Sequence, residues 1–343
     1  MSAKPRLERI LPAAGISGGE VLIEYAGLDS NGAQELSVTF DQGAAHIVAA
    51  TRRRALVLIT DLDTGGEVKV SIQRKGIQLG EAKPFLAGKK IAGELHPVTN
   101  PAFDPADGSL FVTRSGSRGE HVPVSLFRIN PRGEVAEFSG DISNPTGIAF
   151  DKTGRMFITS RLDGTVYRVA PPHEVVAFAT DLGIATGLAF NRDGEMFVGD
   201  RSGTIYRVNE IGEPKPWATL EPSVSAYHLA FGPDGFLYVA GPTVCSFDEI
   251  IRFNEEGEPS IFYRGLGRPQ GLAFDRDGNL YVAASLRGRR GIVRISRDGN
   301  KAEIVVAGMN LVGLAFSASG EMIVATNDSV YSLALGIHGT LLD

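Results

Sequence analysis

Residues 268–282, RPQGLAFDRDGNLYV, contain the pattern that decides the fold. An apolar run, GLAF, is followed by a turn rich in Asp and Gly and then by a second apolar run, LYV. Short apolar runs bounded by Asp and Gly are typical of buried strands that a tight turn connects. This stretch therefore predicts a β-hairpin.

Variants of the same phrase occur five more times along the chain. They read VTNPAFDPADGSLFV (98–112), SNPTGIAFDKTGRMFI (143–158), IATGLAFNRDGEMFV (184–198), SAYHLAFGPDGFLYV (225–239) and LVGLAFSASGEMIV (311–324). Successive Ala-Phe pairs are 47, 40, 41, 43 and 42 residues apart. A third strand such as TVYRV follows each hairpin, and a less regular fourth strand such as KPWAT follows all but the last. A period of about 40–45 residues with four strands per repeat predicts a β-propeller.

The last repeat ends after its third strand, near Leu335, so its fourth strand has to come from elsewhere in the chain. Residues 81–87, EAKPFLA, resemble the fourth strands KPWAT and EIVVA and lie just before the first repeat. An unclosed ring would leave a sheet edge exposed. We therefore expect an all-β protein whose six-bladed β-propeller is closed by residues 81–87, which pair with residues 329–335.

The first 77 residues lack the repeat. Short segments at 6–10, 20–26, 35–40, 45–50, 55–60 and 67–73, several of them alternating in polarity, are separated by turns rich in Gly and Asp. Six such strands in this length predict a β-sandwich. Within it, residues 52–54 are three consecutive arginines, which we interpret as a solvated strand end. The expected domains are the sandwich at 1–77, the propeller at 78–336 and a C-terminal tail at 337–343.

Both parts resemble known families. The stretches ILPAAGISGGEVLIEYAG, VTFDQGAAHIVAA and GGEVKVSIQ resemble the IPT/TIG immunoglobulin-like family, which implies an Ig-like spacer or interaction module. The repeat phrase, PQGLAFD at 269–275 and DGNLYVA at 277–283, resembles the NHL-repeat propellers. It is similar more broadly to the six-bladed group that includes the gluconolactonase, senescence-marker-protein and strictosidine-synthase-like families. These resemblances imply a fold much more specifically than a function.

The bulk properties of the chain argue against several classes of function. A net charge of −6 argues against general nucleic-acid binding. The single cysteine, Cys245, allows neither an internal disulfide nor a thiolate metal cluster. No apolar stretch approaches the roughly 18 residues of a membrane helix, and the N-terminal residues lack the apolar region of a signal peptide. We therefore expect a cytoplasmic protein with neither nucleic acid nor membrane as a partner.

Comparing the repeats with one another separates scaffold positions from candidate site positions. The third strands share an arginine, which we interpret as structural; these are Arg128, Arg168, Arg207, Arg252 and Arg294, with Ser332 as the exception. The position near the start of each first strand differs between repeats and lies at the mouth of the central channel. These residues are Thr99, Thr146, Thr186, His228, Gln270 and Val312. The polar ring suits either a hydrogen-bonded small ligand or channel water.

The loops after the second strands are expected to open on the same face. They contain Arg114, Arg161, Arg201 and Arg287. One hypothesis is that this mouth binds a small anionic molecule or an acidic protein surface. The alternative is that Asp163, Asp200 and Asp328, which lie in the same loops, neutralise the arginines locally.

The resemblance to gluconolactonases implies a hydrolase with a divalent metal, usually calcium, in the channel. That family binds the metal with a Glu just before the first repeat, where Glu94 stands here, and with Asn and Asp at the mouth. The mouth positions of this chain are neutral Thr, His and Gln side chains, and one carboxylate among neutral groups is a poor calcium site. A metal-free enzyme, such as a lyase, would depend on His228 as a general base.

The favoured function is non-enzymatic. We expect a ligand- or partner-binding scaffold that uses the channel mouth, with the N-terminal domain as a spacer or second contact. The alternative is a metal-dependent lactonase with a degenerate site, in which Glu94 and His228 are the catalytic candidates and Glu94 is the metal ligand. No cofactor is predicted outside that alternative, which would use calcium or another divalent ion.

Overall fold

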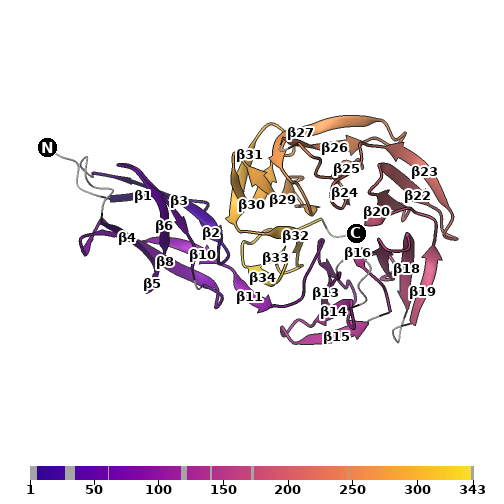
Figure 1. Ribbon diagram of the computed structural model, residues 1–343, viewed down its shortest axis with the longest axis horizontal. Helices are drawn as coiled ribbons and strands as arrows, with labels where there is room; N and C mark the ends of the chain where they lie inside the picture. Colours follow the sequence, from indigo (N-terminus) through magenta and orange to yellow (C-terminus); the bar gives the residue numbers. More distant parts are fainter. Residues whose placement is uncertain are drawn as a thin grey trace.

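The computed structural model describes residues 6–27, 35–60, 62–116, 122–139, 141–170, 174–245 and 247–340. Within these ranges every regular element is a β-strand, and no helix is present that is long and apolar enough to span a bilayer. The N-terminal strands form one end of an elongated molecule, and the later strands form a ring of sheets (Figure 1). The last three residues of the expected tail, 341–343, lie outside the described residues.

Two sheets enclose the core of the N-terminal part. One sheet has the order β1 (Arg6–Leu11), β3 (Glu20–Ala26), β7 (Arg54–Leu58) and β6 (His46–Ala50). In the other, β8 (Gly66–Arg74) lies between β4 (Leu36–Phe40) and β10 (Lys83–Ala87), with β5 (Gly43–Ala44) and β9 (Ile77–Gln78) at the edges. Alternate residues of β3, namely Val21, Ile23 and Tyr25, are buried because successive side chains of a strand point to opposite faces.

Each of the first five repeats forms four strands that pair in antiparallel fashion, and the sixth repeat forms three. The first three units are β12 (Ala102–Phe103), β13 (Leu110–Thr113), β14 (Leu126–Ile129) and β15 (Val135–Ser139); β16 (Pro145–Phe150), β17 (Met156–Ser160), β18 (Thr165–Ala170) and β19 (Glu174–Ala179); and β20 (Ala185–Phe190), β21 (Met196–Asp200), β22 (Thr204–Val208) and β23 (Pro214–Thr219). The later units are β24 (His228–Phe231), β25 (Leu237–Ala240), β26 (Asp248–Phe253) and β27 (Pro259–Gly267); β28 (Leu272–Phe274), β29 (Leu280–Leu286), β30 (Arg289–Ile295) and β31 (Ala302–Ala307); and β32 (Leu311–Phe316), β33 (Met322–Thr326) and β34 (Val330–Leu333). The predicted hairpin at 268–282 is confirmed, since β28 pairs with β29.

The recurring phenylalanine of the phrase packs each unit against its neighbour. An aromatic ring on the second strand of one unit meets the phenylalanine on the first strand of the next unit. The pairs are Phe111–Phe150, Phe157–Phe190, Phe197–Phe231, Tyr238–Phe274 and Tyr281–Phe316, with ring centroids 4.7–5.9 Å apart. Edge-on and tilted aromatic contacts of this kind add to the burial of apolar area. The repeated residues therefore make the packing contacts between adjacent units of the ring.

The third-strand arginines belong to the scaffold, as expected from their recurrence. Arg128 pairs with Asp107, Arg207 pairs with Glu195, and Arg294 lies 3.7 Å from Glu303. The guanidinium of Arg252 lies 5.0 Å from the ring centre of Phe236. Ser332, which replaces the arginine in the last unit, donates a hydrogen bond to Glu321.

The last unit receives its fourth strand from β11 (Lys89–Ala92), which pairs with β34. The prediction that residues 81–87 provide this strand is wrong, because β10 pairs with β8 in the N-terminal part. The side chain of Phe85 is buried there, with its ring centroid 5.1 Å from that of Phe40. These pairings favour a boundary between the two parts after Ala87 rather than after residue 77.

A short strand, β2 (Ala14–Gly15), joins the N-terminal part to the ring. It pairs in parallel with β10 on one side and with β31 on the other. The amide of Ile16 donates to the carbonyl of Ala307 at 2.9 Å, and the side chain of Ile16 is buried in a cluster with residues of β29–β34. A Cβ on Gly19 would lie 2.6 Å from the same carbonyl oxygen, so a glycine is needed for this approach. The two parts therefore share a continuous hydrogen-bonded sheet.

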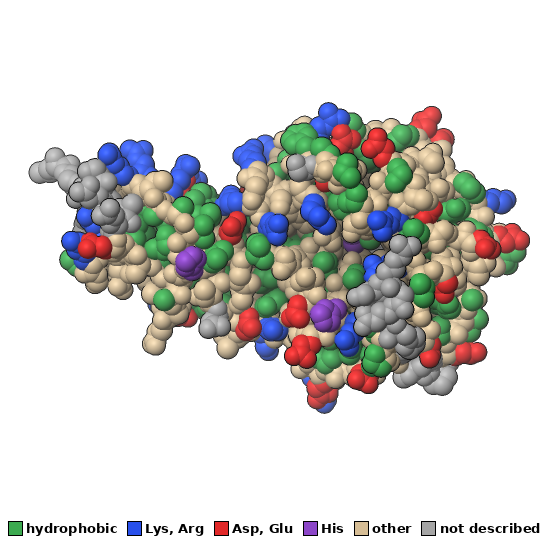
Figure 2. Space-filling view, viewed as in Figure 1, with side chains coloured by type: hydrophobic (Ala, Val, Ile, Leu, Met, Phe, Trp, Pro, Cys, Tyr) green, Lys and Arg blue, Asp and Glu red, His purple; other side chains and the backbone are tan. Residues whose placement is uncertain are grey.

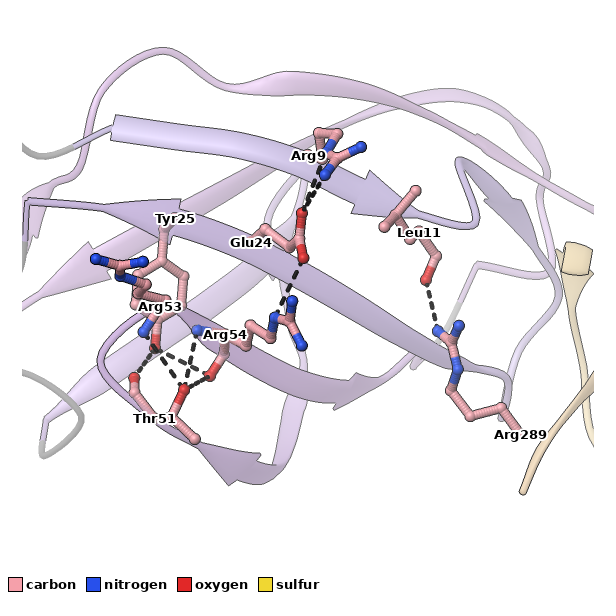
Figure 3. Close-up of polar contacts among 8 residues, drawn as sticks. All are labelled: Arg9, Leu11, Glu24, Tyr25, Thr51, Arg53, Arg54 and Arg289. Atoms are coloured by element: carbon pink, nitrogen blue, oxygen red, sulfur yellow. Dashed lines mark hydrogen bonds and ion pairs between the residues drawn. The ribbon is translucent and has the colours of Figure 1, made fainter. Parts of the chain in front are cut away.

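A side-chain contact crosses the same junction. Arg289 of β30 donates to the carbonyl oxygen of Leu11 at 3.2 Å (Figure 3). On the N-terminal sheet, Arg9 and Arg54 share the carboxylate of Glu24 at 3.0 and 3.2 Å. The arginines at 52–54 are exposed at the β6–β7 turn, in agreement with a solvated strand end.

Candidate functional site

Glycines bring the inner strands of neighbouring units into close contact at the hub of the ring. A Cβ on Gly147 would lie 2.5 Å from the Thr186 carbonyl oxygen, and one on Gly187 would lie 2.4 Å from that of Tyr227. Real side chains do not tolerate such distances, so backbones can meet here only through glycine. The inner strands of neighbouring units are consequently very close together where Gly147 and Gly187 lie.

Asn100 occupies the equivalent of these glycines in the first unit, and its side chain extends to the fifth and sixth. Its Nδ2 donates to the Leu272 carbonyl at 2.8 Å, and its Oδ1 accepts from the Leu314 amide at 3.0 Å. The side chain therefore links three units of the ring. This role was not predicted, although Asn100 stands at a position that is Gly in four of the repeats, which marks it as unusual.

Two of the predicted mouth residues, Thr99 and His228, contact each other, and the hydroxyl groups of Thr146 and Thr186 already have backbone partners. Thr99, Thr146, Thr186 and His228 are buried, and Gln270 is half-buried. The hydroxyl of Thr186 donates to the Gly199 carbonyl and accepts from the Tyr227 amide. The hydroxyl of Thr146 donates weakly, at 3.5 Å, to the Asn144 carbonyl. The threonines therefore stabilise the hub and are poorly placed to bind a ligand.

His228 differs from its neighbours because one of its ring nitrogens is unsatisfied. Its Nδ1 lies 3.3 Å from the hydroxyl of Thr99, which comes from the opposite side of the ring. Its Nε2 is buried and has no hydrogen-bond partner among the described residues. Burial lowers the pKa of His228 to about 4, so the imidazole is neutral at neutral pH. An unsatisfied buried nitrogen costs about 1–3 kcal/mol, which a water or a ligand atom at Nε2 would recover.

The geometry does not group the residues of the proposed metal site. Glu94 and His96 are both exposed and both have left-handed backbones, with φ of 60° and 48°. They flank Leu95, whose amide donates to the Asp328 carbonyl at 2.9 Å. Within the described ranges, no three His, Cys, Asp or Glu side chains lie close enough together to bind a metal ion. A calcium ion needs several oxygen ligands, and the residues at the hub do not fit it.

Two of the predicted mouth arginines, Arg161 and Arg201, directly follow the second strands of adjacent units, and their charges interact. Arg161 donates to the Gly116 carbonyl at 3.0 Å and to Asn144 Oδ1 at 3.4 Å, while Arg201 donates to the Ser223 carbonyl at 3.1 Å. Burial, together with the positive charge of Arg201, lowers the pKa of Arg161. All of these acceptors are neutral oxygens, so the charges of the two guanidinium groups are not compensated by them.

The nearby carboxylates have other partners. Asp163 accepts from the Thr165 amide and the Tyr167 hydroxyl, and Asp200 accepts from the Ile184 amide and from Ser202. No ion pair between these aspartates and Arg161 or Arg201 is found among the described residues. The third aspartate, Asp328, accepts from the hydroxyl of Ser329. The expected local neutralisation is therefore not observed at this pair.

The other two arginines of the mouth are less clearly placed. Arg114 is half-buried and its amide donates to the Ser125 carbonyl, while Arg287 is exposed at the turn between β29 and β30, with φ of 52°. Figure 2 shows one face of the ring, where several Lys and Arg side chains lie toward the middle, while other Lys and Arg side chains and most of the Asp and Glu side chains lie near the outer edge. A basic centre is thus present on a protein of negative net charge.

No family model and no curated protein matches the chain. Solved structures do resemble it. A gluconolactonase from Xanthomonas campestris has a TM-score of 0.58 at 17% identity, covering 72% of this chain and 89% of that one. A catalytically inactive variant of virginiamycin B lyase from Staphylococcus aureus, with quinupristin, has a TM-score of 0.54 at 15% identity, covering 88% and 100%. An auxiliary nutrient binding protein from Bacteroides ovatus has a TM-score of 0.56 at 14% identity, covering 96% and 98%.

At these identities the likeness concerns the fold alone. The match to the nutrient binding protein extends over nearly the whole chain, including the N-terminal sheets. The all-β chain therefore has a β-propeller fold that is shared by enzymes and by binding proteins.

Proposed function

We propose that this protein is a binding scaffold whose channel mouth binds an anionic group. In this proposal the ring is a six-bladed propeller closed by β11, and the immunoglobulin-like N-terminal part is a spacer or second contact. The observation that carries the proposal is the neighbouring pair of Arg161 and Arg201, whose side chains bind only neutral oxygens among the described residues. An anion between them would relieve their mutual repulsion and form charge-assisted hydrogen bonds.

The main alternative is a divalent-metal-dependent lactonase. Its support is the structural likeness to a protein described as a gluconolactonase. The donor set disfavours it, because Glu94 is exposed and the hub contributes mainly hydroxyl groups that already bind backbone atoms. We therefore derive no metal-dependent step for this chain.

A metal-free enzyme that uses His228 is a further alternative. Its support is the unsatisfied Nε2 atom at the hub. The same atom is equally suited to bind a channel water, because no described carboxylate contacts the imidazole and orients it for proton transfer. Anion binding requires no such partner and accounts for the two arginines as well.

The test is the change in melting temperature that inorganic phosphate causes at constant ionic strength. A ligand that binds only the folded state stabilises it by about 2.7 kcal/mol at a hundredfold excess over its dissociation constant. We expect this stabilisation in the wild type and its loss in the Arg161→Gln/Arg201→Gln double variant. Phosphate also stabilises proteins by exclusion from their surface, so the comparison needs a control.

The matched control is Arg192→Gln. Arg192 also donates to a neutral carbonyl, that of Pro233 at 3.0 Å, but it lies in the β20–β21 turn at the other end of the strands. This variant should keep the full phosphate response. Equal responses in the double variant, the control and the wild type would refute the proposed function.

A further inference from the structure

We propose that the loops around the two arginines dock a protein segment in which an acidic residue is flanked by apolar side chains. This inference rests on the proposed function and specifies the occupant of the same site. We call this surface the rim and define it as Arg201 together with four loops, residues 161–164, 180–184, 220–227 and 241–247, of which Ser246 lies outside the described residues.

Exposed apolar side chains are grouped on the four loops of the rim. Of the eleven large hydrophobic side chains that are exposed in the described ranges, five lie on these four loops. They are Leu162 (53% exposed), Ile184 (38%), Val224 (41%), Val244 (95%) and Phe247 (60%). Single exposed apolar residues are common on protein surfaces, whereas a group of them on adjacent loops is typical of an interaction site.

Backbone hydrogen bonds connect the loops of the rim in sequence around the mouth. The Leu182 amide donates to Gly164, the Arg201 amide donates to Ile184, and the Ser223 amide donates to Arg201. The Val224 amide then donates to Pro242, which brings in the loop with Val244 and Phe247. Because each loop is bonded to the next, the apolar side chains and the two arginines belong to one continuous surface.

The shape and composition of the rim favour a protein over a small molecule. A small-molecule site surrounds its ligand in a concavity, whereas Val244 and Phe247 project into solvent. Aromatic residues and arginines are enriched at the energetically important positions of protein interfaces, and here Phe247 and Arg201 supply both types. The positive charge of the two arginines, which no carboxylate among the described residues compensates, selects an acidic residue in the partner. The surrounding apolar side chains select apolar neighbours for that residue.

The experiment measures fluorescence anisotropy of a labelled peptide in which aspartates alternate with leucine and phenylalanine. Two matched peptides replace either the apolar residues by serine or the aspartates by asparagine. We expect the first peptide to bind at least about tenfold more tightly than either matched peptide, because each type of contact contributes on the order of the free energy of one hot-spot residue. We also expect about tenfold weaker binding to Val244→Ser/Phe247→Ser. The control Ile211→Ser changes a side chain that is 74% exposed in the β22–β23 turn and should have no effect.

If the serine-containing acidic peptide binds as tightly as the apolar one, or if Val244→Ser/Phe247→Ser binds the peptide normally, the inference is refuted while phosphate binding still supports the proposed function. Equal binding of the asparagine peptide would show that the arginines do not select charge and would also refute the inference. Equally tight binding of a single-stranded DNA oligonucleotide would refute it in favour of a nucleic acid. If the wild-type protein binds neither phosphate nor the peptide, the proposed function itself is refuted.

Discussion

Replacing Ile16 by alanine should destabilise the propeller, although Ile16 lies near the start of the chain. Its side chain is 1% exposed and packs in a cluster with Tyr281, Ile292 and Leu333 of the ring. The substitution removes three carbon atoms, which corresponds to about 2.4 kcal/mol at about 0.8 kcal/mol for each buried methylene. The remaining cavity raises the expected loss of unfolding free energy into the range of about 2–5 kcal/mol.

The assay is urea unfolding followed by the fluorescence of Trp217, the single tryptophan of the chain. Trp217 lies in β23, and its ring centroid is 4.9 Å from that of Phe197, so its emission reports on the ring. With a slope on the order of 3 kcal/mol per molar urea, a loss of about 3 kcal/mol lowers the midpoint by about 1 M.

The matched control is Ile211→Ala, which removes the same atoms from an exposed side chain and should leave the midpoint unchanged. A midpoint for Ile16→Ala that equals the wild-type value would refute the reasoning. It would mean that the sheet shared through β2 does not contribute to the stability of the propeller.

Three further predictions concern the hub. Asn100→Ala leaves the Leu272 carbonyl and the Leu314 amide without their partner and should lower the unfolding free energy by about 1–3 kcal/mol for each group, measured by urea unfolding, whereas a change below about 0.5 kcal/mol would contradict the bridging role. Gly187→Ala places a Cβ 2.4 Å from the Tyr227 carbonyl oxygen and should cost about 1–3 kcal/mol, and an unchanged melting temperature would count against the close packing of the inner strands. His228 has a pKa of about 4 in the folded protein against 6.5 for an unperturbed histidine, so protons bind the unfolded state more tightly and stability is lost as the pH falls from 6.5 toward 4. The melting temperature of His228→Gln should therefore fall less steeply over that range, and parallel curves for variant and wild type would argue against a neutral buried imidazole.

The repeat phrase was sufficient to predict the strands of the ring because its information is local. Each hairpin needs only two apolar runs and a turn, and the aromatic contacts between units follow from the same positions. The closing strand could not be identified in this way. Strands β10 and β11 are separated only by Gly88, and both are short segments with apolar and polar residues. Which of them joins which sheet depends on the burial of Phe85 against Phe40, a contact between residues far apart in the chain.

The sequence indicated that some residues of the inner strands lie near one another, but it did not indicate which hydrogen bonds they make. The sequence placed Thr99 and His228 at the mouth, and the structure brings them within 3.3 Å of each other. That the threonine hydroxyls bind backbone atoms, and that Asp163 and Asp200 do not reach the arginines, depends on loop geometry that no pattern in the sequence specifies. The exposure of Val244 and Phe247 could likewise not be predicted, because the sequence of an irregular loop does not specify which of its apolar side chains are buried.

The parallel pairing of β2 between β10 and β31 also has a consequence for avidity. When two binding surfaces are connected by a flexible linker, the effective concentration of the second surface depends on the length and stiffness of that linker. In the proposed function the N-terminal part is a second contact, and the pairing of Gly15 with Ala307 would then replace the linker by a sheet and hold the two contacts at one spacing. A partner whose two contact points match that spacing would gain the full avidity of a second contact. One with a mismatched spacing would gain none, so the junction itself can act as a selectivity filter between otherwise similar partners.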